Sequence, residues 1–155
     1  MSRAFLALPV ALLLLSPPAI AGDDRVPPVT DDLTRKECGQ CHMAFQPAFL
    51  PARSWEKMMD DLADHFGEDA SLTPAKAQAI RAYLTTNAGD RVGNGVARSF
   101  MRWVAPEGAP QRITENPAFL REHNFRDDVW KRPEVGARSN CPACHVDAER
   151  GWFED

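Results

Sequence analysis

Two Cys-x-x-Cys-His motifs, at residues 38–42 and 141–145, lie near opposite ends of this 155-residue chain. Together they contain all four cysteines of the sequence and two of its four histidines. In such a motif each thiol can add to one vinyl group of a porphyrin, and the histidine that follows can bind the iron. The sequence therefore predicts two covalently attached c-type haems. The residues expected to hold them are Cys38, Cys41 and His42 for the first haem, and Cys141, Cys144 and His145 for the second.

Three other uses of paired cysteines fit the sequence less well. A redox dithiol of the thioredoxin kind lies near a βαβ pattern, and no such pattern is visible. A four-cysteine zinc site usually has its two pairs about 15–20 residues apart, whereas these pairs lie at residues 38–41 and 141–144. Structural disulfides suit an exported protein, but they would leave the two adjoining histidines unexplained.

The two histidines outside the motifs are candidates for the remaining axial positions on the irons. Two haems have four axial positions and the chain has four histidines, so none is spare. Two imidazoles on each iron would leave no position for oxygen, peroxide or nitrite, which favours electron transfer over catalysis. The predicted iron ligands are His42, His65, His123 and His145.

His65 belongs to a helical pattern. Apolar residues recur at spacings of three, four and seven after Ser54, which is expected to cap the helix, and Gly67 is expected to end it. His65 falls one turn after Leu62 in this apolar stripe. We therefore expect His65 to point inward from a helix.

His123 belongs to a second helical pattern. Asn116 and Pro117 form a typical cap and first turn, and Phe119, Leu120 and His123 fall on one face of the helix that follows. This helix can extend as far as Trp130.

The order of the residues favours His65 as the partner of His42, and His123 as the partner of His145, because consecutive elements are usually adjacent in space. A crossed arrangement, with each distal histidine serving the other haem, stays open. Methionine is the other possible ligand and fits less well, because two of the candidates fall in an apolar stripe where methionine fills gaps and another follows the proximal histidine too closely. These candidates are Met43, Met58, Met59 and Met101.

The N-terminus has the features of an export signal. Residues 1–21 combine a positive start, an apolar run and a small-x-small cleavage site, and the apolar run is too short to span a bilayer. We expect cleavage before Gly22 and a periplasmic location, where haem attachment to such motifs takes place in bacteria. The formal net charge of −4 and the absence of a basic stripe argue against nucleic-acid binding.

The remaining pattern predicts an all-α protein of small helices and long loops wrapped around the two haems. A helix is expected to lead into Cys38, another to cover residues 74–86, and a short one to end near Gly151. The glycine-rich run 89–95 is the expected boundary between an N-terminal haem lobe, residues 22–89, and a C-terminal haem lobe, residues 90–155.

The first lobe resembles a small class I cytochrome c, with His65 at the place of that family's distal methionine. The whole chain resembles the dihaem cytochrome c family, often called DHC. The matching stretches run from Glu37 to Gly67 and from Arg112 to Glu149. The resemblance implies bis-histidine irons, periplasmic electron transfer, and partners such as an oxygen-binding monohaem cytochrome c or a membrane b-type cytochrome.

We therefore expect a soluble electron carrier with two low-potential haems and no enzymatic activity. The alternatives are a dihaem enzyme of the peroxidase kind, in which one axial ligand can leave, and an obligate subunit of a larger redox complex.

Overall fold

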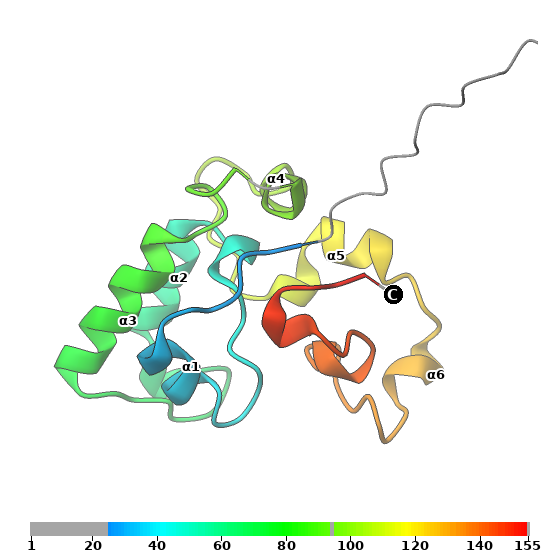
Figure 1. Ribbon diagram of the computed structural model, residues 1–155, viewed down its shortest axis with the longest axis horizontal. Coiled ribbons are helices and arrows are strands. Elements are labelled where there is room, and N and C mark those ends of the chain that lie inside the picture. The colour runs from blue at the N-terminus through cyan, green and yellow to red at the C-terminus, as the bar shows by residue number, and fades with distance from the viewer. Residues whose placement is uncertain (1–24, 94, 155) are drawn as a thin grey trace, which may run out of the picture.

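The computed structural model describes residues 25–93 and 95–154. Over these residues the regular structure consists of α-helices and short 3-10 helices, joined by long loops, and the only β pairing is two isolated bridges (Figure 1). The predicted all-α class is confirmed. The expected signal segment, residues 1–21, lies outside the described residues. No helix in the described ranges has the length and apolar character needed to cross a membrane.

The N-terminal half is built on three helices: α1 (Asp32–Cys38), α2 (Ala52–Asp60) and α3 (Pro74–Thr86). Helices α2 and α3 pack side by side, and α1 lies against α3 (Figure 1). Leu50 and Ile80 are fully buried between them, together with Trp55 and Leu84. The helices predicted to lead into Cys38 and to cover residues 74–86 are therefore confirmed.

The helix predicted to run from Ser54 to Gly67 is wrong at both ends. Helix α2 starts after Pro51, so Ser54 is a buried residue inside its first turn, and α2 ends at Asp60. Two consecutive aspartates at a helix C-terminus oppose the helix dipole and have low helix propensity. A short 3-10 helix, η2 (Leu62–Asp64), follows, so His65 lies on a loop rather than on a helix.

The C-terminal half has shorter elements. They are α4 (Gly95–Met101), η3 (Ile113–Glu115), α5 (Pro117–Glu122), α6 (Asp127–Trp130), η4 (Cys141–Ala143) and η5 (Ala148–Arg150). The Asn116 side chain caps α5 by accepting a hydrogen bond from the Ala118 amide at 2.8 Å, as its position before a proline suggests. The extension of this helix to Trp130 is not observed, because α5 ends at Glu122 and α6 is a separate turn.

The two halves share a hydrophobic core. Phe49, from the turn η1 (Pro47–Phe49), packs with Phe100 of α4 and with Phe153 near the C-terminus, at ring-centroid distances of 5.0 and 5.3 Å. Ala118 and Phe119 of α5 belong to the same buried cluster. The core therefore joins segments that are far apart in the sequence.

The two ends of the described chain also meet. The Val26 amide donates a hydrogen bond to the Gly151 carbonyl at 2.8 Å, and the Arg25 guanidinium lies 3.7 Å from the ring centre of Trp152. Gly151 has a φ of +81°, and a Cβ atom there would lie only 1.8 Å from the Val26 carbonyl oxygen. Only glycine fits this close approach without movement of the backbone.

Candidate haem sites

The structure brings the four histidines together in two pairs. The rings of His42 and His65 have centroids 6.2 Å apart and planes inclined at 28°. The rings of His123 and His145 have centroids 5.8 Å apart and planes inclined at 75°. These are the pairs that the order of residues along the chain favours.

Both separations leave room for one metal atom between the two rings. An imidazole nitrogen binds a transition metal at about 2 Å and lies roughly 1 Å from its own ring centre, so two imidazoles on opposite sides of one metal have centroids about 6 Å apart. A zinc site needs about four protein ligands, yet residues 25–93 and 95–154 contain no cluster of three or more His, Cys, Asp or Glu side chains that could hold a metal. Two ligands from the protein, with the rest from a macrocycle, fit each pair.

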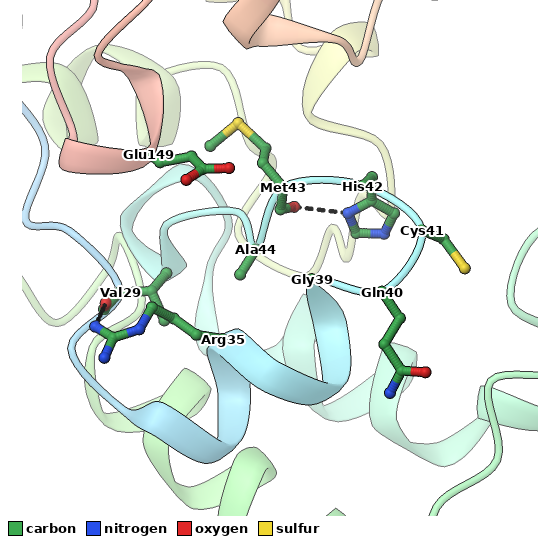
Figure 2. Close-up of a pocket in the computed structure, with 9 residues that line it drawn as sticks. All are labelled: Val29, Arg35, Gly39, Gln40, Cys41, His42, Met43, Ala44 and Glu149. Carbon is green, nitrogen blue, oxygen red and sulfur yellow. Dashed lines mark hydrogen bonds between the residues drawn. The ribbon is translucent and has the colours of Figure 1, made fainter.

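The first motif begins at the end of α1. Cys38 is the last helical residue, and the chain then turns so that Cys41 and His42 lie on a loop beside a hollow of about 330 Å³ (Figure 2). His42 Nδ1 lies 2.6 Å from the Met43 carbonyl oxygen. A carbonyl only accepts, so Nδ1 is the donor and the lone pair of Nε2 is left for a metal.

His65 faces His42 from the loop after η2. Its amide and carbonyl both pair with Glu68, and the next residue, Phe66, adopts a left-handed φ of +57° that turns the chain sharply. Partial burial is the largest cause that lowers the pKa of His65, and the nearby His42 and Arg112 lower it further. Each of these influences favours the neutral imidazole, which is the form that binds a metal.

Arg112, from the second half of the chain, reaches the first site. Its guanidinium lies 4.1 Å from the ring centre of Phe66, the residue next to His65. It also lines a second hollow, of about 520 Å³, together with Arg138 and Ser139, which directly precede the second motif. Arg112 and Arg138 thus line one hollow with two guanidinium groups, which suit the carboxylates of a porphyrin.

The second pair lies among aromatic rings. His123 is the residue directly after α5, and its Nδ1 donates to the Phe119 carbonyl at 3.0 Å. Its ring stacks on that of Phe119 at a centroid distance of 4.0 Å and an angle of 8°. His145 follows η4, and its ring contacts Phe153 at 5.6 Å. Trp130 lies 6.3 Å from His123 on another side.

The four cysteines are arranged in the same way in both motifs, and none is joined in a disulfide. The first cysteine of each motif is half-buried and the second is exposed. Burial raises the pKa of Cys38, and it raises the pKa of Cys141 to about 11, so both are protonated at neutral pH. The structure shows no disulfide among the four cysteines, and each cysteine pair lies next to a motif histidine that is paired with a second histidine, which suits the two thioether bonds of a c-type haem.

Several residues of these sites were not found from the sequence. Phe119 was placed on one helical face with His123 but was not identified as part of the site, although residues four apart are neighbours on a helix. The carbonyl of Met43 and the guanidinium of Arg112 could not be found in this way, because their positions depend on the path of the backbone and on the contact between the two halves.

Comparisons with known proteins place these features in context. Residues 34–153 match the family model described as dihaem cytochrome c. A solved dihaem cytochrome c from Rhodobacter sphaeroides is 46% identical, with a TM-score of 0.75, over 83% of this chain and 100% of that one. A structure of DHC purified from Rhodobacter sphaeroides is 45% identical, with a TM-score of 0.66, over 81% of this chain and 98% of that one.

A third solved structure, a dihaem cytochrome type c from Shewanella baltica OS155, is 35% identical, with a TM-score of 0.63, over 79% of this chain and 86% of that one. A search of curated proteins gave no significant match.

Proposed function

The chain belongs to the dihaem cytochrome c family and has two c-type haems, and from this premise we propose that it is a periplasmic electron carrier with two low-potential, bis-histidine irons. His42 and His65 would hold the first iron, and His123 and His145 the second. Cys38 and Cys41 would form the thioethers of the first haem, and Cys141 and Cys144 those of the second.

The observation that carries this proposal is the presence of two histidine pairs with centroids 6.2 and 5.8 Å apart. Each pair joins the histidine of one motif to a histidine from another part of the chain. These pairs would place an imidazole on each face of a haem, which would leave no position at the metal for a substrate. What remains is the gain and loss of an electron, which is the chemistry that each haem supplies when bound.

The surroundings of the histidines support low reduction potentials. Histidine replaces the axial methionine that raises the potential of ordinary cytochromes c. The Nδ1–H groups of His42 and His123 donate to backbone carbonyls, and such bonds make the metal-bound nitrogen more basic. A more basic ligand stabilises the ferric iron relative to the ferrous iron, which lowers the potential.

The shared core supports electron exchange between the two sites. The ring of Phe153 contacts His145 of the second pair and also Phe49, whose turn follows the first motif. The Gln46 amide group donates to the Ala148 carbonyl at 2.7 Å, in the buried interior. The segments after the two motifs are thus in direct contact, so an electron could enter at one haem and leave from the other.

The proposed partners are other redox proteins. The family resemblance suggests an oxygen-binding monohaem cytochrome c or a membrane b-type cytochrome. The proposed periplasmic location rests on residues 1–21, which have the pattern of a cleaved export signal.

Low-temperature EPR of the oxidised holoprotein, combined with a haemochrome assay, tests the proposal. We expect two haems per chain, both low-spin in the ferric state. We also expect carbon monoxide to bind slowly and incompletely to the reduced protein, because it must displace a histidine. Prompt, full binding at one haem, or a high-spin ferric signal, would overturn the electron-carrier proposal in favour of a peroxidase-like enzyme.

A further inference from the structure

The two histidine pairs differ in the angle between their rings. Their separations are similar, but the planes of His42 and His65 are inclined at 28°, whereas those of His123 and His145 are inclined at 75°. The first pair is therefore close to parallel and the second close to perpendicular. This difference has an electronic consequence for any iron that the pairs hold.

Each imidazole donates π-electron density into the iron d orbital that lies perpendicular to its own ring plane. Iron has two d orbitals of this kind. Two parallel rings act on the same one of them and separate its energy from that of the other. Two perpendicular rings act on one orbital each and leave the two nearly equal in energy. Low-spin ferric iron then gives a rhombic EPR signal in the parallel case, and a single broad signal at a much larger g value in the perpendicular case.

Phe119 accounts for the orientation of the His123 ring. The two rings are in face-to-face contact at 4.0 Å and 8°, which fixes the plane of the imidazole. The Phe119 carbonyl accepts the hydrogen bond from His123 Nδ1 at 3.0 Å, which fixes the rotation of the ring within that plane. Phe119 is only 5% exposed and belongs to the core shared by both halves, so it has little freedom to move.

The other aromatic neighbours of His123 constrain its plane less. Phe125 and Trp130 lie at centroid distances of 6.1 and 6.3 Å, and their planes are inclined to the imidazole by 82° and 37°. In the first site, Phe45 contacts His42 at 4.9 Å and 25°. The closest and most parallel of these contacts is that between Phe119 and His123.

We propose that Phe119 is a positioning residue that holds the His123 ring across the plane of His145, so that the second iron has near-perpendicular ligands and the first has near-parallel ligands. This inference rests on the proposed bis-histidine ligation. The two haems of the protein then differ in their electronic ground state although their ligands are chemically the same.

EPR of the oxidised wild-type holoprotein at low temperature tests the angles. The expected result is two signals of equal intensity, one rhombic and one of the large-g type. Two rhombic signals, or two large-g signals, would overturn the inference while leaving bis-histidine ligation intact. A high-spin signal would instead contradict the proposed function, so the two failures can be told apart.

The role of Phe119 is tested by Phe119→Leu, which keeps an apolar side chain and the backbone carbonyl but removes the flat ring. We expect loss of the large-g signal and the appearance of a second rhombic one, with the first signal unchanged. Phe119→Tyr retains the flat ring and should retain the large-g signal.

Phe119→Met provides a second test with a flexible side chain, should the leucine variant not assemble its haems. A large-g signal that persists in either variant would show that Phe119 does not hold the ring. A matched control is Phe45→Leu, which should alter only the rhombic signal, because Phe45 contacts only the first pair.

Discussion

At the scale of single residues, the position of a proposed ligand decides how much its substitution disturbs the fold. His65 lies on a loop, held by its backbone bonds to Glu68, whereas His42 follows directly on two expected thioether attachments. Since His65 has only local restraint, it is the proposed ligand of the first pair whose replacement should disturb the fold least. It therefore offers the clearest test of the pairing.

We expect His65→Met to raise the reduction potential of one haem and to leave the other nearly unchanged. A thioether stabilises ferrous iron relative to an imidazole, and axial ligands adjust haem potentials over a range of about 0.8 V, so an increase on the order of 0.1 V is reasonable. Potentiometric titration monitored by visible absorbance measures it. Equal shifts at both haems, or none, would contradict the pairing of His65 with His42.

The residues expected to bind the iron could be named from the sequence because the relevant properties are local. Motif spacing and the number of histidines single out His42, His65, His123 and His145 without knowledge of the fold. The ring angles could not be predicted in this way. They depend on contacts such as that between Phe119 and His123, which require the backbone geometry of α5.

At the scale of elements, the helices with strong end signals could be predicted and the others could not. Asp31 caps α1 by accepting from the Thr34 amide at 2.7 Å, and Asn116 caps α5. The apolar stripe that leads to His65 indicated burial correctly for its first turns, where Trp55 and Met59 are buried, but not at its end, where His65 is half-buried and Phe66 is exposed. It did not reveal that the helix ends at Asp60, because the spacing of apolar residues does not register the low helix propensity of Asp60 and Asp61.

Helix α5 depends on Asn116 for its start and for its attachment to α4. The Asn116 side chain is buried, accepts from the Ala118 amide at 2.8 Å and donates to the Phe100 carbonyl at 3.1 Å. We expect Asn116→Ala to lower the free energy of unfolding by about 2–3 kcal/mol, because it removes a cap and leaves a buried carbonyl without its donor. Urea denaturation of the ferric holoprotein measures the loss.

Asn116→Asp is the matched variant, because it keeps the oxygen that caps α5 and removes only the donor to Phe100. Asn116→Asp should lower the free energy of unfolding by a similar amount, since a buried carboxylate would then face the Phe100 carbonyl. If both variants cost less than about 0.5 kcal/mol, the usual range for a surface substitution, the proposed dependence of α5 on Asn116 would be wrong.

At the scale of the whole molecule, the two halves influence each other's sites. Arg112 belongs to the second half, yet its guanidinium lies over Phe66 and contributes to the lowered pKa of His65. A positive charge in this position disfavours ferric iron in the first site. It should therefore raise the potential of the first haem.

We expect Arg112→Gln to lower the potential of the first haem by on the order of tens of millivolts, a modest value because the side chain is about half exposed and partly screened. Arg112→Lys keeps the charge and should keep most of the potential. Redox titrations at low and high salt check this. The difference in first-haem potential between the wild type and Arg112→Gln should be smaller at high salt. A shift confined to the second haem would show that Arg112 acts elsewhere.

The contact between Val26 and Gly151 joins the two ends of the described chain, and two glycine substitutions can show how much it contributes to stability. Gly151 has a left-handed φ of +81° and lies against Val26, where a Cβ atom would be 1.8 Å from the carbonyl oxygen. Gly136 also has a left-handed φ, +68°, but a Cβ atom there would meet nothing within 4 Å. The two glycines therefore separate the cost of the backbone conformation from the cost of a clash.

Gly136→Ala should lower the free energy of unfolding by about 1–2 kcal/mol, the cost of a left-handed alanine. Gly151→Ala should cost clearly more, because the alanine must also push the N-terminal segment away and break the 2.8 Å bond between the Val26 amide and the Gly151 carbonyl. Denaturation midpoints of the two ferric holoproteins make the comparison. Equal losses would mean that the contact between the chain ends adds nothing to stability, and that the buried cluster around Phe49 holds the two halves together without it.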